Sequence, residues 1–414
     1  MSKPAYSLFQ VTGIELEYMI VDRQSLNIVP ICDELLKKVS GEITADFENG
    51  AIAWSNELVT HVVELKTNGP VNSLQGLSEQ FHENIKQINQ LLEPHNAILM
   101  PTGAHPWMNP FNETRIWPHE HNEIYSLYNR IFDCRGHGWS NLQSMHINLP
   151  FANDEEFGLL HAAIRVLMPI MPALSASTPV LDGKVTGYLD ARMETYRHNQ
   201  KQIPSIAGSI IPEAVYSHQQ YRRVVFDPII RDIKPFDSEG ILDKHFLNSR
   251  GAIARFDRGA IEIRVLDLQE SPLVDLAIAQ FIIETLKWLI QTKKQLLVLA
   301  DGFETSHLSA VFLAVIKDGE AAFVTDSNYL HLWGISETEV KSGAIWQVIF
   351  NAVKARLPHA DQLVIEMILR EGTLATRILR AIGSDTSKDR LKVVYEQLID
   401  ALKGNQMFRY ESAI

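Results

Sequence analysis

Several segments alternate apolar and polar residues with a period of two, and this pattern constrains the fold more than any other feature of the sequence. Side chains two residues apart on a β-strand point to the same face of a sheet, so each such segment predicts a strand with one apolar and one polar face. The alternating or β-branched runs predict strands at residues 12–22, 57–67, 97–102, 142–149 and 260–267. A sheet built from the part of the chain before residue 270 is therefore expected.

The polar faces of four of these strands carry ionisable side chains. In the first strand Glu15 and Glu17 share a face, and two like charges side by side on a sheet repel each other. The same face of the other three strands carries Glu64 with Lys66, His146 with Ser144 and Asn148, and Glu262 with Arg264. An ordinary half-exposed sheet also alternates hydrophobic and polar residues. Carboxylates and a histidine that recur at the strand centres favour a functional site over a merely solvated face.

The residue types on this face are typical of a metal site. Carboxylate oxygens suit Mg²⁺ or Mn²⁺, and an imidazole can complete such a ligand set. Glu57 is a further acidic candidate, but it lies seven residues before Glu64, which would place the two on opposite faces of one regular strand. Glu57 therefore either precedes the strand or is separated from Glu64 by a bulge. Arg264 offers a guanidinium fork for a carboxylate or phosphoryl group.

Helical periodicity fills the rest of the chain. Apolar residues in 74–92 keep spacings of three and four, which gives that helix one apolar stripe. Long helices are also expected at 154–177 and 272–291, and the pattern is mostly helical after about residue 300. Strands interleaved with long helices predict an α+β fold. We expect a catalytic α+β domain at residues 1–295 and a mostly helical C-terminal subdomain at 296–414, packed on it.

Composition narrows the classes of protein that the chain can be. With 46% hydrophobic and 21% charged residues the sequence is that of an ordinary soluble globular protein, and its net charge of −12 argues against a dedicated nucleic-acid binder. The longest apolar run is interrupted by Gln280, Glu284 and Lys287, so no membrane-spanning helix is expected. Cys32 and Cys134 form no metal-binding spacing, and the N-terminus resembles no signal peptide, so we expect a cytoplasmic protein.

Two loop segments are candidates for lining a pocket. The segment 101–111 places His105 among Gly, Pro and Trp residues, although Gly and Pro also mark ordinary turns. The segment 173–197 follows a predicted helix with small residues and then Arg192 and Arg197, which suits anion binding but also an ordinary surface loop. The phosphate-binding pattern GxxxxGK[ST] and the pattern GxGxxG are both absent, so a nucleotide would be held by another device.

A histidine-rich stretch, "WPHEHNEIY", invites a zinc interpretation through His119, His121 and Glu123. Their spacing matches no established zinc motif, and histidines near the start of a helix are more often solvated, so we favour the solvated interpretation.

Six segments match a known family in order and in approximate spacing: "GIELEY", "VELKT", "GAHPW", "MHINLP", "ALSASTPVLDG" and "AIEIRVLD". Over about residues 11–290 the chain resembles the glutamate–cysteine ligase superfamily, and most closely its bacterial carboxylate–amine ligase branch. The resemblance implies a fold like the catalytic domain of glutamine synthetase, with a curved antiparallel sheet, a polar concave face that forms a funnel, and helices packed on the convex face.

The resemblance also implies a chemistry. Family enzymes use ATP and Mg²⁺ to phosphorylate a carboxylate, commonly the γ-carboxylate of glutamate, and an amine then attacks the acyl phosphate. Carried over by motif, the metal ligands would be Glu15, Glu17, Glu57, Glu64, His146 and Glu262. Glu262 and Arg264 would be catalytic, and His105, Arg192 and Arg264 would bind substrate. The implied partners are two small molecules, an amino acid carboxylate and an amine, and a homodimer is a candidate assembly.

The chain departs from the branch at three places. Where the branch reads "HVHVG" this chain reads "HINLP", so Asn148 replaces a histidine and Pro150 a glycine. An insertion containing the histidine-rich segment, 119–137, follows the "GAHPW" motif, and the "TPVLDGKVTGYLDARMETYR" loop differs in detail. These departures put cysteine in doubt as the co-substrate. Two alternatives stay open, namely a guanidino or amine phosphotransferase on a related fold and a non-catalytic protein that binds a nucleotide or metabolite.

Overall fold

The computed structural model describes residues 6–410. Its largest sheet has eight strands in the order β2-β3-β4-β1-β6-β10-β9, with β5 paired to β1, and every pairing is antiparallel. The strands are β1 (Gly13–Asp22), β2 (Asp46–Asn49), β3 (Ile52–Asn56), β4 (Val62–Thr67), β5 (Ala97–Met100), β6 (Ser144–Pro150), β9 (Ala252–Arg255) and β10 (Ala260–Asp267). Two separate pairs are β7 (Val180–Leu181) with β8 (Lys184–Val185), and β11 (Phe323–Val324) with β12 (Val340–Lys341).

All five predicted strands are present in this sheet, and the antiparallel α+β class is confirmed. The sequence pattern missed the short strands β2, β3 and β9. Each of them spans four or five residues and lies toward an end of the sheet, so it shows too few alternations to be recognised.

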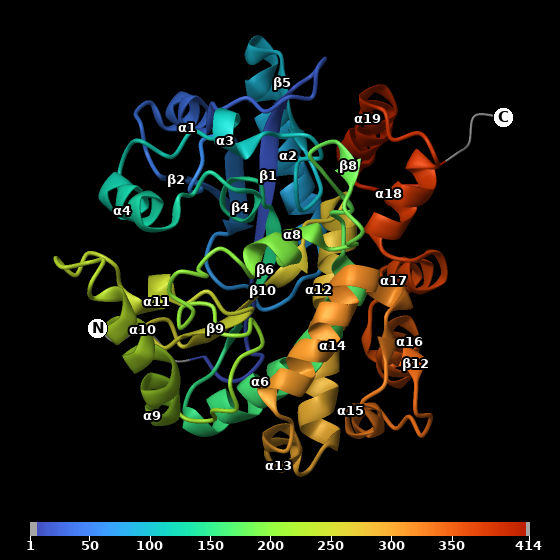
Figure 1. Ribbon diagram of the computed structural model, residues 1–414. Helices are drawn as coiled ribbons and strands as arrows, with labels where there is room; N and C mark the ends of the chain where they lie inside the picture. The colour runs from blue at the N-terminus through green and yellow to red at the C-terminus, as the bar shows by residue number, and fades with distance from the viewer. Residues whose placement is uncertain (1–5, 411–414) are drawn as a thin grey trace.

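Helices surround the sheet (Figure 1). Before β10 they are α1 (Cys32–Ser40), α2 (Leu77–Leu92), α3 (Pro110–Glu113), α4 (Asn122–Phe132), α5 (His137–Ser140), α6 (Asp154–Leu167), α7 (Pro172–Ser175), α8 (Ala191–Tyr196), α9 (His218–Tyr221), α10 (Asp227–Ile233) and α11 (Lys244–Leu247), with a π-helical turn at Arg222–Phe226. After β10 they are α12 (Pro272–Thr292), α13 (Leu296–Asp301), α14 (Thr305–Asp318), α15 (Ser327–Leu332), α16 (Ser342–Val353), α17 (His359–Glu371), α18 (Leu374–Ile382) and α19 (Lys388–Gly404). Short 3₁₀ turns lie at Glu93–His95, Met168–Ile170, Gly319–Ala321 and Lys354–Arg356.

Of the two long helices predicted at 154–177 and 272–291, the structure confirms one and divides the other. The helix expected at 272–291 is α12, almost residue for residue. The one expected at 154–177 is broken into α6, a 3₁₀ turn and α7. Pro169 is the second residue of the 3₁₀ turn and Pro172 begins α7, and a proline cannot donate the hydrogen bond that continues an α-helix. The last helix, α19, is capped at its N-terminus by Ser387, whose side chain accepts a hydrogen bond from Arg390 N.

The two faces of β1 are covered differently. Ile14, Leu16 and Tyr18 on its apolar face belong to the main core, together with apolar residues of α2 and α12. The opposite face carries Glu15 and Glu17, but it continues with buried apolar residues that pack against α18 and α19. The resemblance implied helices on the face opposite the polar one, but α18 and α19 also cover the polar face where its residues become apolar.

The main core runs without interruption through residues on both sides of position 295, so the division into two domains stays a prediction. None of the described helices combines the length and the apolar character that crossing a bilayer requires.

Candidate functional site

The strand register brings the ionisable residues of the polar face together. Glu15 of β1 lies opposite Lys66 of β4 on one side and opposite His146 of β6 on the other. Glu17 lies directly opposite Glu64. Residues opposite each other in an antiparallel pair share a face, so the register confirms that these ionisable side chains lie on one face, as the alternation predicted.

The fourth strand completes the row through a bulge. Glu262 of β10 lies opposite Asn148 of β6, but the register shifts between Ile263 and Leu266. Arg264 lies within that irregularity, and a bulge redirects the side chains that it contains. The Arg264 Nε lies 2.8 Å from Glu262 Oε1. Burial disfavours the charged guanidinium, but the charge of Glu262 raises the pKa of Arg264 above its ordinary value.

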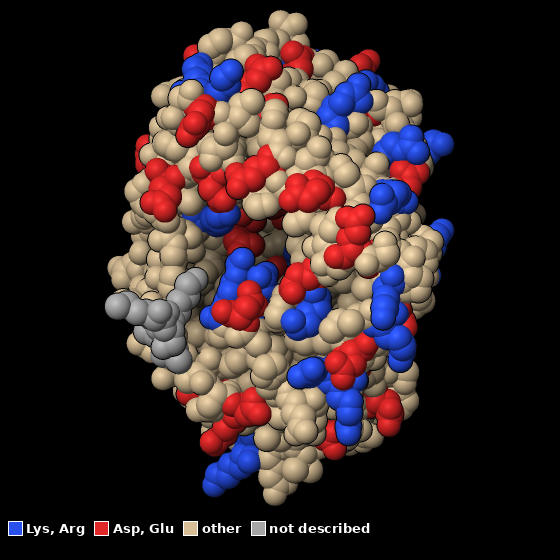
Figure 2. Space-filling view, turned by 90° about the vertical axis from the view of Figure 1, so that its left-hand side faces the viewer, with Lys and Arg blue, Asp and Glu red and all other residues tan. Residues whose placement is uncertain are grey.

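These side chains line a cavity of about 920 Å³. Figure 2 shows a hollow in this face of the molecule, with acidic and basic side chains around its mouth. Of the residues predicted for a site, the cavity wall includes Glu15, Glu17, Glu57, Glu64, His146, Arg192, Glu262 and Arg264. The structure thus assembles all six predicted metal ligands and both predicted arginines around one space.

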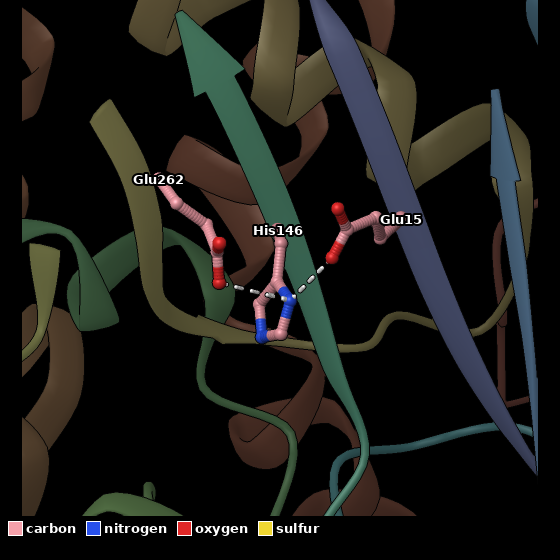
Figure 3. A group of neighbouring side chains, drawn as sticks. All are labelled: Glu15, His146 and Glu262. Carbon is pink, nitrogen blue, oxygen red and sulfur yellow. Dashed lines mark hydrogen bonds and ion pairs between the residues drawn. The ribbon is translucent and has the colours of Figure 1, made fainter. Parts of the chain in front are cut away.

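His146 lies at the centre of the acidic residues (Figure 3). Its Nδ1 donates a hydrogen bond to Glu15 Oε2 at 2.9 Å and lies 3.8 Å from Glu262 Oε1. Its Nε2 lies 2.9 Å from Ser144 Oγ and 3.9 Å from Glu17 Oε1. Two groups of three could each hold a metal ion, because their ligand atoms lie within 4.8 Å of one another: Glu15, His146 and Glu262, and Glu17, Glu64 and His146. The imidazole belongs to both.

The pKa shifts on either side of His146 show where positive charge is already supplied. Burial disfavours ionisation of Glu15, but the hydrogen bond and charge of His146 hold the pKa of this carboxyl down at about 2. Burial also disfavours the charged imidazole, yet the hydrogen bond to Glu15 and the charge of Glu17 raise the pKa of His146. Glu15 and His146 therefore stabilise each other's charged forms in the metal-free protein. A protonated ring must lose a proton before it can bind a metal.

The other side of the cluster is short of positive charge. Burial, followed by the charge of Glu15, raises the pKa of Glu64 to about 7. Burial and the charges of Glu17 and Glu64 raise the pKa of Glu57 well above its ordinary value. Lys66 Nζ lies 3.1 Å from Glu64 Oε1 but is shared with Asp46. Divalent cations would supply the charge that this side lacks, so the residues fit a metal.

The two alternatives for Glu57 are resolved by the strand boundaries. It lies in the connection between β3, which ends at Asn56, and β4, which begins at Val62, so it precedes the strand. The pattern did not predict that α4 would bring Tyr125 to this corner. Burial and the charge of Glu57 raise the pKa of the Tyr125 hydroxyl to about 12. That tyrosine lies in the inserted segment.

The two predicted substrate contacts outside the strands have different surroundings. His105 is buried away from the cavity wall, where its Nε2 lies 2.7 Å from Leu26 O and its Nδ1 accepts from Met108 N at 2.9 Å. Both ring nitrogens are thus occupied by backbone groups, one in the loop itself and one at Leu26 after β1. Arg192 does line the cavity, and it forms a buried ion pair with Asp267. Its Nη1 and Nη2 each lie 3.4 Å from Arg264 O.

The histidine-rich segment offers no group of three ligands among the residues that the structure describes. His119 Nε2 lies 2.9 Å from Asp33 Oδ2 in a half-buried contact, and the exposed His121 Nε2 lies 3.7 Å from Glu120 Oε1. The inserted segment 119–137 contributes Tyr125 and Tyr128 of α4 to the cavity wall.

Comparison with known proteins places the chain in a family. The model of glutamate–cysteine ligase family 2 matches residues 11–309. The chain belongs to this family. An uncharacterized protein of Archaeoglobus fulgidus is 36% identical over 270 residues, which is 65% of this chain and 72% of that protein. A Citrobacter koseri protein, whose name gives it as a candidate glutamate–cysteine ligase 2, is 23% identical over 67% of this chain and 68% of its own length.

Other relatives are matched over a shorter stretch. A Methylibium petroleiphilum protein, also named as a candidate glutamate–cysteine ligase 2, is 25% identical over 192 residues, and the match spans 46% of its length. Two solved structures share the fold at 14% identity. A Francisella tularensis glutamate–cysteine ligase in complex with AMP has a TM-score of 0.58 over 97% of this chain and 90% of its own. A Pasteurella multocida bifunctional glutathione synthetase has a TM-score of 0.57 over 95% of this chain and 52% of its own.

Proposed function

We propose that the protein is an ATP- and Mg²⁺-dependent carboxylate–amine ligase. The observation that carries this proposal is the pair of three-residue groups that share His146 inside one cavity. Membership of glutamate–cysteine ligase family 2 supports the same reaction class. The acid is of the amino acid type, with the γ-carboxylate of glutamate as the first candidate.

The reaction must overcome the poor electrophilicity of a carboxylate. In the first step a carboxylate oxygen attacks the γ-phosphorus of ATP, and ADP leaves with the electron pair of the broken P–O bond. In the second step the amine nitrogen forms a bond to the acyl carbon, phosphate leaves with the electron pair of the C–O bond, and the nitrogen loses a proton. The sum is acid plus ATP plus amine giving amide, ADP and phosphate. Divalent cations, when bound, supply charge neutralisation for the phosphates.

The residues of this chain have separable tasks in that scheme. The acidic cluster holds the cations, with Glu15, His146 and Glu262 on one side and Glu17 and Glu64 on the other. Arg264 lies beside Glu262 and would stabilise the negative charge that develops on the transferring phosphoryl group. Arg192 would orient the acid through the nitrogens that contact the Arg264 carbonyl.

Hydroxylamine trapping tests the proposal. The protein is incubated with ATP, Mg²⁺, hydroxylamine and a panel of amino acids, and both ADP and hydroxamate are measured. The proposal expects at least one acid to yield both products in equal amounts, and no product when EDTA replaces Mg²⁺. ADP and hydroxamate absent for every acid would contradict it, and ³¹P NMR showing a stable phosphorylated amine would identify a phosphotransferase instead.

A further inference from the structure

Part of the cavity is lined by aromatic side chains for which the proposed chemistry has no task. Tyr128 of α4, Trp139 of α5, Tyr196 of α8 and Phe246 of α11 lie on its wall, and we call these four the aromatic wall. The Tyr128 ring meets Trp139 edge to face at 5.5 Å and Phe246 at 5.1 Å. Tyr128, Trp139 and Phe246 thus form one connected surface of rings, and Tyr196 adds a fourth ring to the wall.

The polar tips of the two tyrosines are turned to the protein backbone. The Tyr196 hydroxyl donates to Ser249 O at 3.1 Å, and the Tyr128 hydroxyl lies 3.5 Å from Phe246 O. Phe246 is 44% exposed, although it is a large hydrophobic residue. What the wall offers to a ligand is therefore ring surface, and covering it with apolar groups is favourable.

Charged groups at the edge of the wall are already paired. Arg255 makes a two-point contact with Asp257, at 3.2 and 3.0 Å, and His245 Nδ1 lies 2.9 Å from Asp243 Oδ1. Arg258, which also lines the cavity, shares Asp257 with Arg255 at 3.9 Å, so this edge carries more basic than acidic charge, unlike the acidic cluster in the same cavity, and the rings themselves are uncharged. A ligand held here would be recognised by shape and apolar contact more than by charge.

One polar group in this region lacks a partner. Gln200 lines the cavity and is only 2% exposed, and its Nε2 donates to Ser249 Oγ at 3.0 Å. Ser249 Oγ in turn donates to Leu247 O, so the serine proton is committed and the amide orientation of Gln200 is fixed. Among residues 6–410 its Oε1 accepts no hydrogen bond. A buried acceptor of this kind is satisfied when a ligand brings a donor.

The wall adjoins the reacting centre. Arg192 and Tyr196 are four residues apart on α8, so their side chains lie on the same helix face. Arg192 contacts the carbonyl of Arg264, whose Nε lies 2.8 Å from Glu262. A group beside Tyr196 is thus one helical turn from Arg192 and the acidic cluster. An attacking amine must lie close to the acyl phosphate formed there. The adenine ring of ATP, by contrast, is separated from the γ-phosphate by the ribose and the other two phosphates.

We infer that the aromatic wall and Gln200 bind the amine co-substrate and select one with a bulky apolar carbon skeleton, in place of a small polar or thiol-bearing amine. This inference rests on the proposed ligase function. A neutral amide acceptor suits the task, because it orients one N–H without adding negative charge that would raise the pKa of the amine. The amine then keeps the lone pair that attacks the acyl carbon.

Binding of probe amines to the whole chain tests the inference without ATP. The probes are 2-phenylethylamine, ethanolamine and cysteamine, measured by titration calorimetry. We expect 2-phenylethylamine to bind at least about tenfold more tightly than the other two, because only it covers the rings. Ethanolamine or cysteamine binding as tightly would overturn the inference, and so would displacement of 2-phenylethylamine by adenosine, which would identify a nucleobase site.

Variants locate the binding. Phe246→Ala should weaken 2-phenylethylamine about three- to tenfold and leave ethanolamine unchanged, and Gln200→Met should weaken 2-phenylethylamine about tenfold. Phe111→Ala is the matched control, since Phe111 is 66% exposed and lies off the cavity wall. An unchanged affinity in Phe246→Ala would contradict the inference, and this variant suffices if Gln200→Met does not fold. Failure of the ligase proposal would be visible separately, as no ADP from any acid with hydroxylamine.

Discussion

The acidic cluster and the aromatic wall share one cavity but are built from different kinds of element. The cluster lies on the central strands β1, β4, β6 and β10, where the antiparallel register fixes which side chains meet. The wall lies on α4, α5, α8 and α11, which come from separate stretches of chain and meet only through packing. The residues proposed for the family's reaction thus lie on a rigid sheet, and the residues proposed to select the amine lie on helices outside that sheet.

The largest expected effect is the loss of turnover when a cluster carboxylate is neutralised. Glu262→Gln or Glu15→Gln should lower ATP turnover by about 10³-fold or more, because each removes a metal ligand in a buried site. The apo protein should melt below the wild-type temperature, because Glu15 is the partner of His146 and Glu262 the partner of Arg264, and the buried cation loses its counter-charge. Glu48→Gln, at an exposed carboxylate of β2, is the control and should behave as wild type. Wild-type ATP turnover in either variant, once it is shown to be folded, would contradict the metal-ligand role.

A smaller effect is expected at Asp267, the partner of the Arg192 side chain that lies between the acidic cluster and the aromatic wall. Asp267 forms the buried ion pair with Arg192 and also accepts from Ser177 N at 2.8 Å and Thr178 Oγ1 at 3.0 Å. Asp267→Asn should raise KM for the acid about tenfold and lower the free energy of unfolding by about 3 kcal/mol, because a buried arginine loses its counter-charge. Steady-state kinetics and urea denaturation measure both quantities. A wild-type KM for the acid in this variant would contradict the proposal that Arg192 orients the acid.

The pH dependence of stability should have opposite signs for Glu64 and Glu15, which lie on the two sides of the acidic cluster. The folded protein binds the Glu64 proton more tightly than the unfolded chain, because its pKa is raised from 4.5 to about 7. Stability from this group is therefore present below pH 4.5 and is lost as pH rises through 7, by at most about 3 kcal/mol.

Thermal melts in EDTA from pH 4.5 to 7.5 should show this loss, and Glu64→Gln should flatten it. Glu15 has the opposite sign, since its pKa is lowered to about 2 and its contribution disappears as pH falls from 4.5 toward 2. Adding Mg²⁺ at pH 7.5 should restore stability in the wild type. A Glu64→Gln profile that overlays the wild type would show that this carboxyl is not perturbed.

The smallest effect is expected at the histidine-rich segment. His119→Asn removes a half-buried contact to Asp33 that lies away from the cavity, so unfolding free energy should change by less than about 1 kcal/mol and turnover not at all. Metal analysis of the purified protein should find no zinc that depends on His119. Loss of a bound zinc ion in this variant would revive the zinc interpretation.

The residues on the strands could be predicted from the sequence because side chains two residues apart on a strand point to the same face. Glu15, Glu17, Glu64, His146 and Glu262 could be placed on one face before any fold was known. The aromatic wall could not be predicted, because no short-range pattern relates α4, α5 and α11. Only the spacing of Arg192 and Tyr196, four residues apart, hinted that both would face the same side.

His105 shows the opposite failure, since a loop rich in Gly, Pro and Trp resembled a pocket lining. Its imidazole instead bonds to the backbone at Leu26 and Met108, partners that lie outside any sequence pattern. Through these contacts the imidazole connects the 101–111 loop to the backbone at Leu26.

The most direct test of the central claim is the position of bound metal. A crystal of the protein grown with Mn²⁺ and ADP would be measured at the manganese absorption edge, and anomalous peaks would be located. Peaks at about 2.0–2.3 Å from oxygens of Glu15 and Glu262 or of Glu17 and Glu64, beside His146, are the predicted result. Manganese found only elsewhere, with the carboxylates around His146 unliganded, would contradict the account.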